Sequence, residues 1–297
     1  MKYFILLLTA FICFNVTAQP NYINISTTDV GPGVVHKKYL EPVQPWTLNV
    51  LEIDLTNPMI TLESIIANDN IKGSGTVRTQ LNSKIREGHT AIGAINGDFY
   101  SATPINSQVI NGELIKQEDA GHYWATFNLD INNNPAITTN RFSSFVIAGG
   151  SKFEIKGINQ ARNSNWMVLY NSYYGTSTST GAGVKELVIS PTDEWLVNDT
   201  MKFVVESIGS GNAVLNKNKA VLSGEGSASD FITQNIHFGD TISLYMGLTN
   251  ALPKLKQLIG GFPRIVKDGG NYAIDGYREE GGTSTFHTDI HPRSAIG

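Results

Sequence analysis

Apolar and polar residues alternate along much of this chain with the period of two that is typical of β-strands. Residues 46–55 (WTLNVLEIDL) show this pattern, with a slip at Val50-Leu51 that indicates a β-bulge. Pro58 ends the run, and residues 59–67 (MITLESIIA) have the composition of its partner. We therefore expect two paired strands in this region.

One stretch has a helical period instead. Val77, Leu81 and Ile85 recur four residues apart, as they do on one face of an α-helix. Thr76 can cap the start of this helix, and Gly88 can end it. The spacing predicts a helix over residues 76–87.

Beyond this helix the pattern is mainly that of short strands. Residues 90–95 (TAIGAI) form an apolar run short enough to be a buried strand. Further strand-like runs lie at residues 124–131, 145–148, 166–170, 185–190, 201–206 and 241–246. In the last run Ile242, Leu244 and Met246 alternate with more polar neighbours, which predicts a half-buried strand. The fold class expected is α+β, rich in β, with a mixed sheet core and few helices.

Composition narrows the class of protein. Hydrophobic residues make up 41% of the 297 residues, enough for a globular core, and charged residues only 16%. The net charge of -4 and the lack of any basic run argue against a nucleic-acid partner.

The N-terminus has the features of an export signal. A positively charged start (MK) precedes an apolar stretch at residues 3–14, and VTA at residues 16–18 matches a cleavage site, so residues 1–18 are predicted to be a signal peptide. The apolar stretch is too short for a comfortable membrane span, and no later segment approaches one. Cys13, the only cysteine, lies within the signal, so we expect a mature chain without disulfides, located in the periplasm or outside the cell.

The first polar cluster follows the apolar run at residues 90–95. Asn96 can donate and accept hydrogen bonds, Gly97 permits a positive φ, and Asp98 brings a carboxylate. A buried strand that exits into such a turn presents side chains at the end of a sheet, which makes Asn96 and Asp98 candidate site residues. An ordinary turn explains the same residues, because Asn-Gly is a common hairpin signal.

The second cluster lies at residues 258–270 (LIGGFPRIVKDGG). Paired glycines let backbone amides approach an anion closely, so Gly260 and Gly261 are candidate phosphate-binding residues. Asp268 brings a carboxylate a few residues later. The alternative is a glycine-rich loop, a strand and an Asp-Gly turn.

The third cluster closes the chain at residues 286–297 (FHTDIHPRSAIG). His287, Asp289 and His291 are spaced by two, so in an extended chain all three face one way. That arrangement suits a metal ion, or an acid/base pair beside a phosphate-binding arginine, because Arg293 falls on the same face and a guanidinium binds phosphate oxygens in a bidentate way. A solvated polar loop is the alternative.

Taken in order, these stretches resemble a known family. AINGDFY, LYNSYYG, GVKELVI, VLSGEGSASDFI, GGFPRIVKDG and HPRSAIG, with PWTLNVLEIDL upstream, are similar to segments of the bacterial phosphodiester glycosidases. That family shares its catalytic domain with the mannose 6-phosphate uncovering enzyme, N-acetylglucosamine-1-phosphodiester alpha-N-acetylglucosaminidase. The resemblance covers nearly the whole chain after the signal, and the ordered set is more specific than any one motif.

The resemblance implies cleavage between the anomeric carbon of a sugar and a phosphate, and it implies roles for individual residues. Arg293 is expected to bind the phosphate, with His291 as a second donor or an acid/base. Asp268 is expected to face the anomeric carbon or orient its neighbours. Asn96 is expected to fix a sugar or phosphate oxygen.

The sequence departs from the family pattern at several places. Asp98 stands where similar sequences often have glycine, so its catalytic role rests on its chemistry alone. Arg264 stands where small or apolar residues are frequent, and it is assigned to the surface. Family members continue well beyond the HPR segment, so the resemblance implies that the C-terminal part of the domain is missing. The expected organisation is a signal at 1–18, a β-rich region with one helix at 19–88, and an incomplete glycosidase domain at 89–297.

The function predicted is that of an exported hydrolase, a phosphodiester glycosidase of the glycoside hydrolase type. Its substrate would be a phosphodiester-linked sugar or glycan of a bacterial cell envelope or the extracellular space. One alternative is a non-catalytic module that binds phosphoglycans or other carbohydrates. The other is a metal-dependent phosphoesterase that uses His287, Asp289 and His291. No cofactor is certain, and a divalent cation is the one candidate.

Overall fold

The computed structural model describes residues 20–297 except residues 100, 102, 120, 122 and 284. The predicted signal peptide lies outside these described residues. The chain divides into two compact units between Met59 and Ile60. The helix expected in the N-terminal region therefore belongs to the second unit. The assignment of residues 89–297 to a glycosidase domain stays a prediction.

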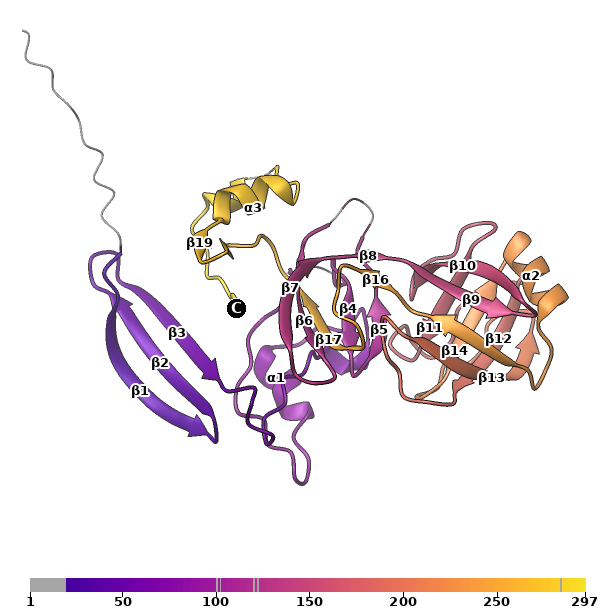
Figure 1. Ribbon diagram of the computed structural model, residues 1–297, viewed down its shortest axis with the longest axis horizontal. Helices are drawn as coiled ribbons and strands as arrows, with labels where there is room; N and C mark the ends of the chain where they lie inside the picture. Colours follow the sequence, from indigo (N-terminus) through magenta and orange to yellow (C-terminus); the bar gives the residue numbers. More distant parts are fainter. Residues whose placement is uncertain (1–19, 100, 102, 120, 122, 284) are drawn as a thin grey trace, which may run out of the picture. The chain divides into compact units, whose positions relative to one another are not determined.

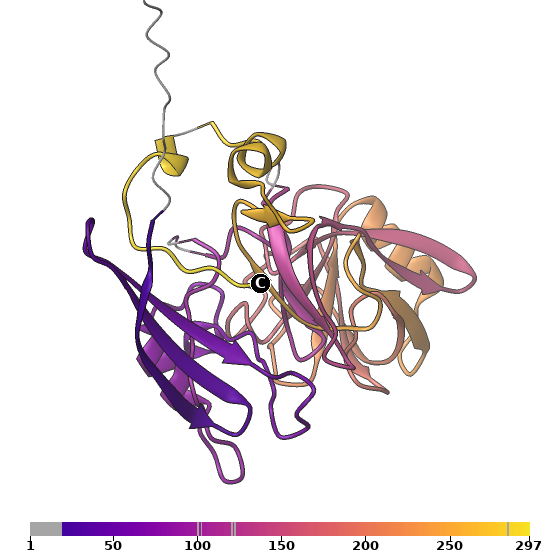
Figure 2. The same cartoon turned by 60° about the vertical axis from the view of Figure 1, so that its left-hand side comes forward.

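The first unit is a three-stranded antiparallel sheet of β1 (Ile23–Gly31), β2 (Val34–Glu41) and β3 (Trp46–Ile53), seen side by side in both views (Figure 1, Figure 2). β3 confirms the strand predicted over residues 46–55. The bulge predicted at Val50-Leu51 is wrong, because these residues pair without a register shift with Lys37 and His36. The register shifts of this sheet lie between β1 and β2 instead.

The partner strand predicted over residues 59–67 is also wrong. β3 pairs with β2, and residues 60–66 have no strand structure before the short 3-10 helix η1 (Ala67–Asp69). Side chains, rather than a neighbouring strand, form the hydrogen bonds to the backbone groups of this segment. The backbone N of Ser64 donates to Gln257 Oε1, and Gln108 Nε2 donates to the carbonyl of Ile65.

Helix α1 (Val77–Ser83) confirms the predicted helix and its start. The hydroxyl of Thr76 accepts a hydrogen bond from the backbone N of Thr79 at 3.1 Å, which satisfies one of the free amides of the first turn. The helix ends earlier than predicted, at Ser83, with Lys84 as its C-cap residue. Gly88, with φ +71°, serves the tight turn between Arg86 and His89 rather than the helix end.

A closed seven-stranded barrel forms one part of the second unit (Figure 1). Its strands are β9 (Ser144–Ala148), β10 (Ser151–Ile158), β11 (Met167–Asn171), β12 (Lys185–Pro191), β13 (Thr200–Gly209), β14 (Ala220–Gly224) and β15 (Thr241–Tyr245). Only the β10–β11 pairing is parallel. Helix α2 (Ser227–Asn235) packs on the barrel, whose core is apolar. The strand runs predicted from residue 145 onwards are confirmed, and Ile242 and Leu244 point inward as the alternation predicts.

A five-stranded sheet carries the rest of the core. Its order is β5 (Glu113–Lys116), β4 (Gln108–Ile110), β17 (Leu255–Gly260), β6 (Ala125–Asp130) and β7 (Pro135–Thr139). Smaller elements are β8 (Arg141–Phe142) with β16 (Leu248–Thr249), the hairpin of β18 (Val266–Lys267) and β19 (Gly270–Asn271), helix α3 (Ala273–Glu279) and the 3-10 helix η2 (Thr285–His287). The fold is α+β and rich in β, as expected. Among the described residues, no helix is both long enough and apolar enough to cross a membrane.

The buried strand predicted over residues 90–95 is wrong. This segment is irregular, and Ile92 and Ile95 are 37% and 49% exposed. No strand of the described residues pairs with it, so its apolar side chains lack the neighbours that a buried strand needs. The chain bonds to the central sheet only after this run, where the backbone N of Asp98 donates to the carbonyl of Gly260 at 2.7 Å.

A pair of buried asparagines ties the barrel to the five-stranded sheet. Asn159 Nδ2 donates to the carbonyl of Ile115 and to Asn171 Oδ1, at 2.9 and 2.6 Å. Asn171 Nδ2 donates to the carbonyl of Leu114 at 3.2 Å. Both asparagines are at most 2% exposed, so neither has water as a substitute partner.

We predict that Asn171→Leu lowers the free energy of unfolding by about 1–3 kcal/mol, because it leaves buried groups of Asn159 and Leu114 without partners. Urea unfolding of the variant measures this change. Asn82→Leu on exposed α1 is the matched control and should stay within about 0.5 kcal/mol of the wild type. Equal effects of the two substitutions would show that the asparagine pair contributes nothing specific.

Candidate functional site

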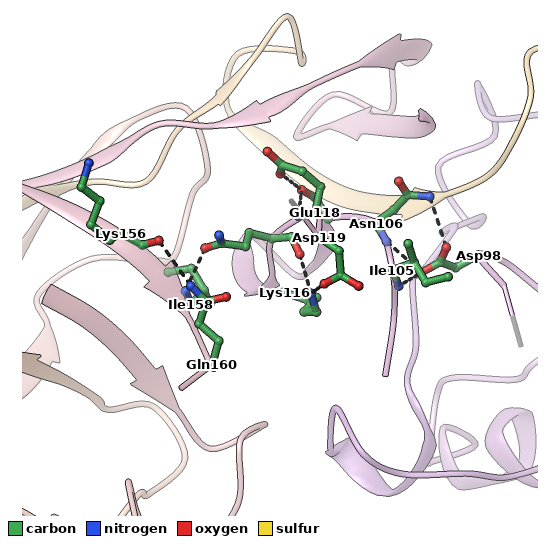
Figure 3. A network of polar contacts seen from close by, with 11 residues as sticks. Asp98, Ile105, Asn106, Lys116, Glu118, Asp119, Lys156, Ile158 and Gln160 are labelled. Carbon is green, nitrogen blue, oxygen red and sulfur yellow. Dashed lines mark hydrogen bonds and ion pairs between the residues drawn. The ribbon is translucent and has the colours of Figure 1, made fainter. Parts of the chain in front are cut away.

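Asp98 is held in one position by its neighbours on both sides. Its carboxylate accepts hydrogen bonds from the backbone N of Ile105 at 2.7 Å and from the backbone N and Nδ2 of Asn106, each at 3.2 Å (Figure 3). Its own backbone N is bonded to Gly260. The residue has φ +55°, a conformation that Asp tolerates better than most residues. A fixed carboxylate therefore lies at the end of β17.

Burial raises the pKa of the Asp98 carboxyl, and the hydrogen bonds from Asn106 and Ile105 oppose this shift without cancelling it. The protonated form of Asp98 therefore persists to higher pH than in a solvated aspartate. Carboxyls whose pKa is shifted by burial are frequent at functional sites, which makes Asp98 a candidate.

The glycine pair makes this arrangement possible. A side chain at Gly260 would place its Cβ only 2.3 Å from the Cβ of Asn106, so only glycine leaves room for Asn106. The backbone N of Gly261 donates to the carbonyl of Ala125 at 2.8 Å, which fixes the chain as it leaves β17. The structure thus brings Gly260 and Gly261 to Asp98, and their role as phosphate ligands stays a prediction.

Asn106 was missed by sequence reasoning. It is 1% exposed, and it reaches both Asp98 and, at 3.4 Å, the carbonyl of Gly261. Nothing in the local sequence PINSQ marks it, since its partners lie 8 and 155 residues away. Only the tertiary structure identifies it as the residue that orients the Asp98 carboxylate.

A buried polar seam continues from Asn106 along the sheet. Thr126 pairs with Gly260 across β6 and β17, so its side chain lies on the face that Asn106 covers. Thr126 Oγ1 accepts hydrogen bonds from Asn140 Nδ2 at 2.8 Å and from Asn128 Nδ2 at 3.2 Å. These polar side chains therefore satisfy one another's hydrogen-bonding groups inside the sheet.

Aromatic rings gather around Phe99, the residue that follows Asp98 in the chain. Phe99 lies 5.1 Å from Trp124 and 6.1 Å from Phe262, and Trp124 lies 4.7 Å from Phe262, as measured between ring centroids. Tyr277 lies 5.5 Å from Phe262, and His287 lies 4.3 Å from Tyr277. The ring cluster formed by these five residues therefore joins all three polar stretches of the sequence.

Arg264 is not the surface residue that was expected. Its side chain is 17% exposed, and its Nε lies 2.7 Å from Oε1 of Glu280, whose side chain is 1% exposed. Glu280 also accepts a hydrogen bond from the backbone N of Ala125 at 2.9 Å. This ion pair holds the residues after α3 against the start of β6, and thereby positions Tyr277 in the ring cluster.

Asp268 occupies a hairpin turn. It lies between β18 and β19 with φ +51°, followed by Gly269 with φ +74°, and its side chain is exposed. Positive φ at both central residues is the requirement of a type I′ turn, for which Asp-Gly is a preferred pair. The turn explains this residue fully, and its predicted role at the anomeric carbon is not tested.

The closing stretch does not have the extended form that was assumed. The backbone N groups of Thr288 and Asp289 both donate to the carbonyl of Thr285, so the chain turns at η2. His287 and Asp289 therefore do not share a face in the predicted way. Asp289 Oδ2 accepts a hydrogen bond from Thr285 Oγ1, and Arg293 Nη2 donates to the carbonyl of Asp289 at 2.9 Å.

No group of three or more His, Cys, Asp or Glu side chains in the described part of the chain is placed to hold a metal ion. His291 is exposed on the segment after η2, and Asn96 is exposed before Gly97, whose backbone packs on Ile259. The structure therefore brings Asp98, Gly260 and Gly261 into one region, which His287 joins through its contact with Tyr277. Asn96, His287 and His291 are all exposed.

Comparison with known proteins gives a fold and no family. No protein-family model and no curated protein matches the chain. A solved structure of a hypothetical protein from Synechocystis is similar with a TM-score of 0.60 and 13% identity, over 91% of this chain and 49% of that one. A second, described as a "Putative exported protein" of Burkholderia pseudomallei K96243, has a TM-score of 0.45 and 18% identity, over 74% of this chain and 50% of that one. The chain thus spans about half the length of these structures, and the first likeness shows a shared fold alone.

One strongly perturbed carboxyl lies outside this region. Burial raises the pKa of Glu113, on β5, from its ordinary 4.5 to about 7. Burial also raises the pKa of Tyr173, and the Glu113 carboxylate adds to this shift, so the two side chains are close. The ionised form of Glu113 is thus disfavoured in the folded protein.

We predict that Glu113→Gln stabilises the protein at pH 8 but not at pH 4. The pKa of Glu113 is higher in the folded protein than in the unfolded one. Its contribution to the free energy of unfolding is therefore full below pH 4.5 and is lost as the pH rises to about 7, which lowers that free energy by about 3 kcal/mol. Glutamine avoids that cost. Chemical unfolding at both pH values measures it, and a pH-independent effect of the substitution would contradict the burial of Glu113.

We also predict opposite outcomes for two neighbouring glycines. Gly260→Ala should lower the free energy of unfolding by about 1–3 kcal/mol, because its Cβ collides with Asn106. Gly261→Ala should be tolerated, since the nearest atom to its Cβ is the Ala125 carbonyl oxygen at 4.0 Å. Thermal unfolding compares the two variants. Similar melting temperatures would show that Asn106 does not need the space at Gly260.

Proposed function

We propose that this chain is an exported hydrolase that cleaves the glycosyl-phosphate bond of a sugar 1-phosphodiester in a cell-envelope or extracellular glycan. The motif resemblance supplies the reaction class. The observation that carries the proposal is the convergence of three distant stretches on one point. Asp98 bonds to Gly260, Phe99 contacts Phe262, and His287 contacts Tyr277.

The chemistry of the reaction fits such a region. A phosphate monoester leaves more easily than an alcohol, so the site needs less help from a general acid than other glycosidases do. It must stabilise positive charge at the anomeric carbon, position a water molecule and hold the sugar. A fixed carboxylate beside aromatic rings supports the first and third of these tasks.

In this proposal Asp98 supplies the carboxylate, and Asn106 is a positioning residue that orients it. His287 is the imidazole of the ring cluster, in contact with Tyr277, where it can move a proton to or from water. Asp268, His291 and Asn96 remain candidates on exposed segments, and Arg293 remains a candidate for the phosphate.

A non-catalytic glycan-binding module is the second candidate. One observation favours it, because the Asp98 carboxylate accepts three hydrogen bonds from residues 105–106 and so also has a purely structural explanation. No observation favours the metal-dependent phosphoesterase.

The proposal is tested with methyl phosphodiesters of glucose, mannose, galactose and N-acetylglucosamine 1-phosphate in water enriched in oxygen-18. Cleavage of the sugar-oxygen bond places the label on the anomeric carbon, and methyl phosphate is released unlabelled. Label in the phosphate would mean attack at phosphorus and would overturn the glycosidase assignment. Binding without turnover would support the non-catalytic module.

We predict that Asp98→Asn lowers kcat/KM for the best of these substrates by about 10²–10³-fold, because the amide neither carries the charge nor exchanges the proton of the carboxyl. Melting temperature and circular dichroism confirm that the variant folds. Asp193→Asn, on the barrel, is the matched control and should keep full activity. If Asp268→Asn causes the loss and Asp98→Asn does not, the catalytic carboxylate is Asp268.

A further inference from the structure

Arg141 and Tyr123 form a stacked pair beside the site. The guanidinium carbon of Arg141 lies 3.5 Å from the centroid of the Tyr123 ring, well within the range of a cation–π contact. Both side chains are exposed, Tyr123 by 39%. Within the described residues the guanidinium has neither a hydrogen bond nor an ion pair with a carboxylate. Its donors are thus directed to solvent.

The neighbours of both residues in the chain belong to the site. Asn140, which precedes Arg141, is 3% exposed and donates to Thr126, the residue opposite Gly260. Trp124, which follows Tyr123, contacts Phe99 and Phe262 in the ring cluster. The stacked pair therefore lies on the rim of the region that holds Asp98, and it is connected to that region through Asn140, which precedes β8, and through Trp124, which precedes β6.

The chemistry of this pair selects an anion. Stacking on Tyr123 occupies one face of the guanidinium and restricts its motion, while the N–H groups along its edge stay available. Those groups match two oxygens of a phosphate in a bidentate way, which a lysine cannot do. An exposed arginine held in one orientation by a ring, and without a carboxylate partner, is suited to bind a ligand rather than to stabilise the fold.

We propose that Arg141, oriented by Tyr123, binds the phosphate of a sugar 1-phosphodiester whose sugar lies against the ring cluster. This inference rests on the proposed function for the identity of the ligand and adds to it the residue that recognises the phosphate. It differs from the expectation drawn from the motif resemblance, which gives that role to Arg293, whose guanidinium donates to the carbonyl of Asp289.

Binding is measured by calorimetry with a probe that cannot be cleaved, the methyl ester of a C-glycosyl phosphonate, made for each of the four sugars. We expect Arg141→Gln to raise Kd roughly 10- to 100-fold, as loss of a charge-assisted bidentate contact does. Arg141→Lys should recover only part of the affinity. Tyr123→Phe should bind like the wild type because it keeps the ring, and Tyr123→Leu should bind more weakly.

Two controls make the result specific. Arg78→Gln, on exposed α1, removes the same charge elsewhere and should leave Kd unchanged. The neutral methyl glycosides should bind Arg141→Gln and the wild type equally, because they lack the phosphate. If Arg141→Lys bound as tightly as the wild type, the positive charge alone would explain the affinity. That result would overturn the bidentate assignment.

The inference and the proposed function fail separately. Unchanged phosphonate binding in Arg141→Gln overturns the inference, whether or not the labelled-water assay shows hydrolysis. Loss of binding in Arg293→Gln instead would assign the phosphate to Arg293. No phosphonate binding by the wild type also overturns it. Binding that depends on Arg141 in a protein without hydrolysis would support the inference and leave a glycan-binding module.

Discussion

The arrangement around Asp98 depends on the absence of a Cβ at Gly260. Asn106 fills the space that a Cβ would take, and from there it reaches the carboxylate of Asp98. The backbone of Gly260 in turn accepts the hydrogen bond that ties Asp98 to β17. A single glycine at the end of a strand thus sets where a loop, a carboxylate and an orienting amide meet.

Buried or half-buried carboxylates that accept hydrogen bonds from backbone N–H groups recur through the second unit. The carboxylates of Glu280, Glu118 and Glu186 accept hydrogen bonds from the backbone N of Ala125, Phe142 and Ala213 respectively. The distances from N to O are 2.8 or 2.9 Å. A hydrogen bond to a charged acceptor is stronger than a neutral one and has a fixed direction. In a chain whose only cysteine lies at position 13, such bonds fix loops to strands at points where disulfides are not available.

The surroundings of these carboxylates differ, and the difference separates those with a structural role from those with a raised pKa. Glu280 forms an ion pair with Arg264, so its charge is compensated, whereas burial is the largest influence on Asp98 and raises its pKa. Glu113 shares the raised pKa but lies on β5, apart from the ring cluster in the sequence and in its contacts. Asp98 is distinguished by its place in the chain next to Phe99, a member of the ring cluster that joins the three polar stretches of the sequence.

Local sequence determined those features whose cause is local. The strand runs of the barrel follow from alternation, as at Ile242 and Leu244, and the start of α1 follows from Thr76 three residues before the amide that it caps. The Asp-Gly turn at Asp268 is likewise a property of two adjacent residues. The tertiary structure alone decided the rest. Whether an apolar run such as residues 90–95 becomes a buried strand depends on a partner strand, and whether Asn106 matters depends on residues up to 155 positions away, so neither is encoded in the neighbouring residues.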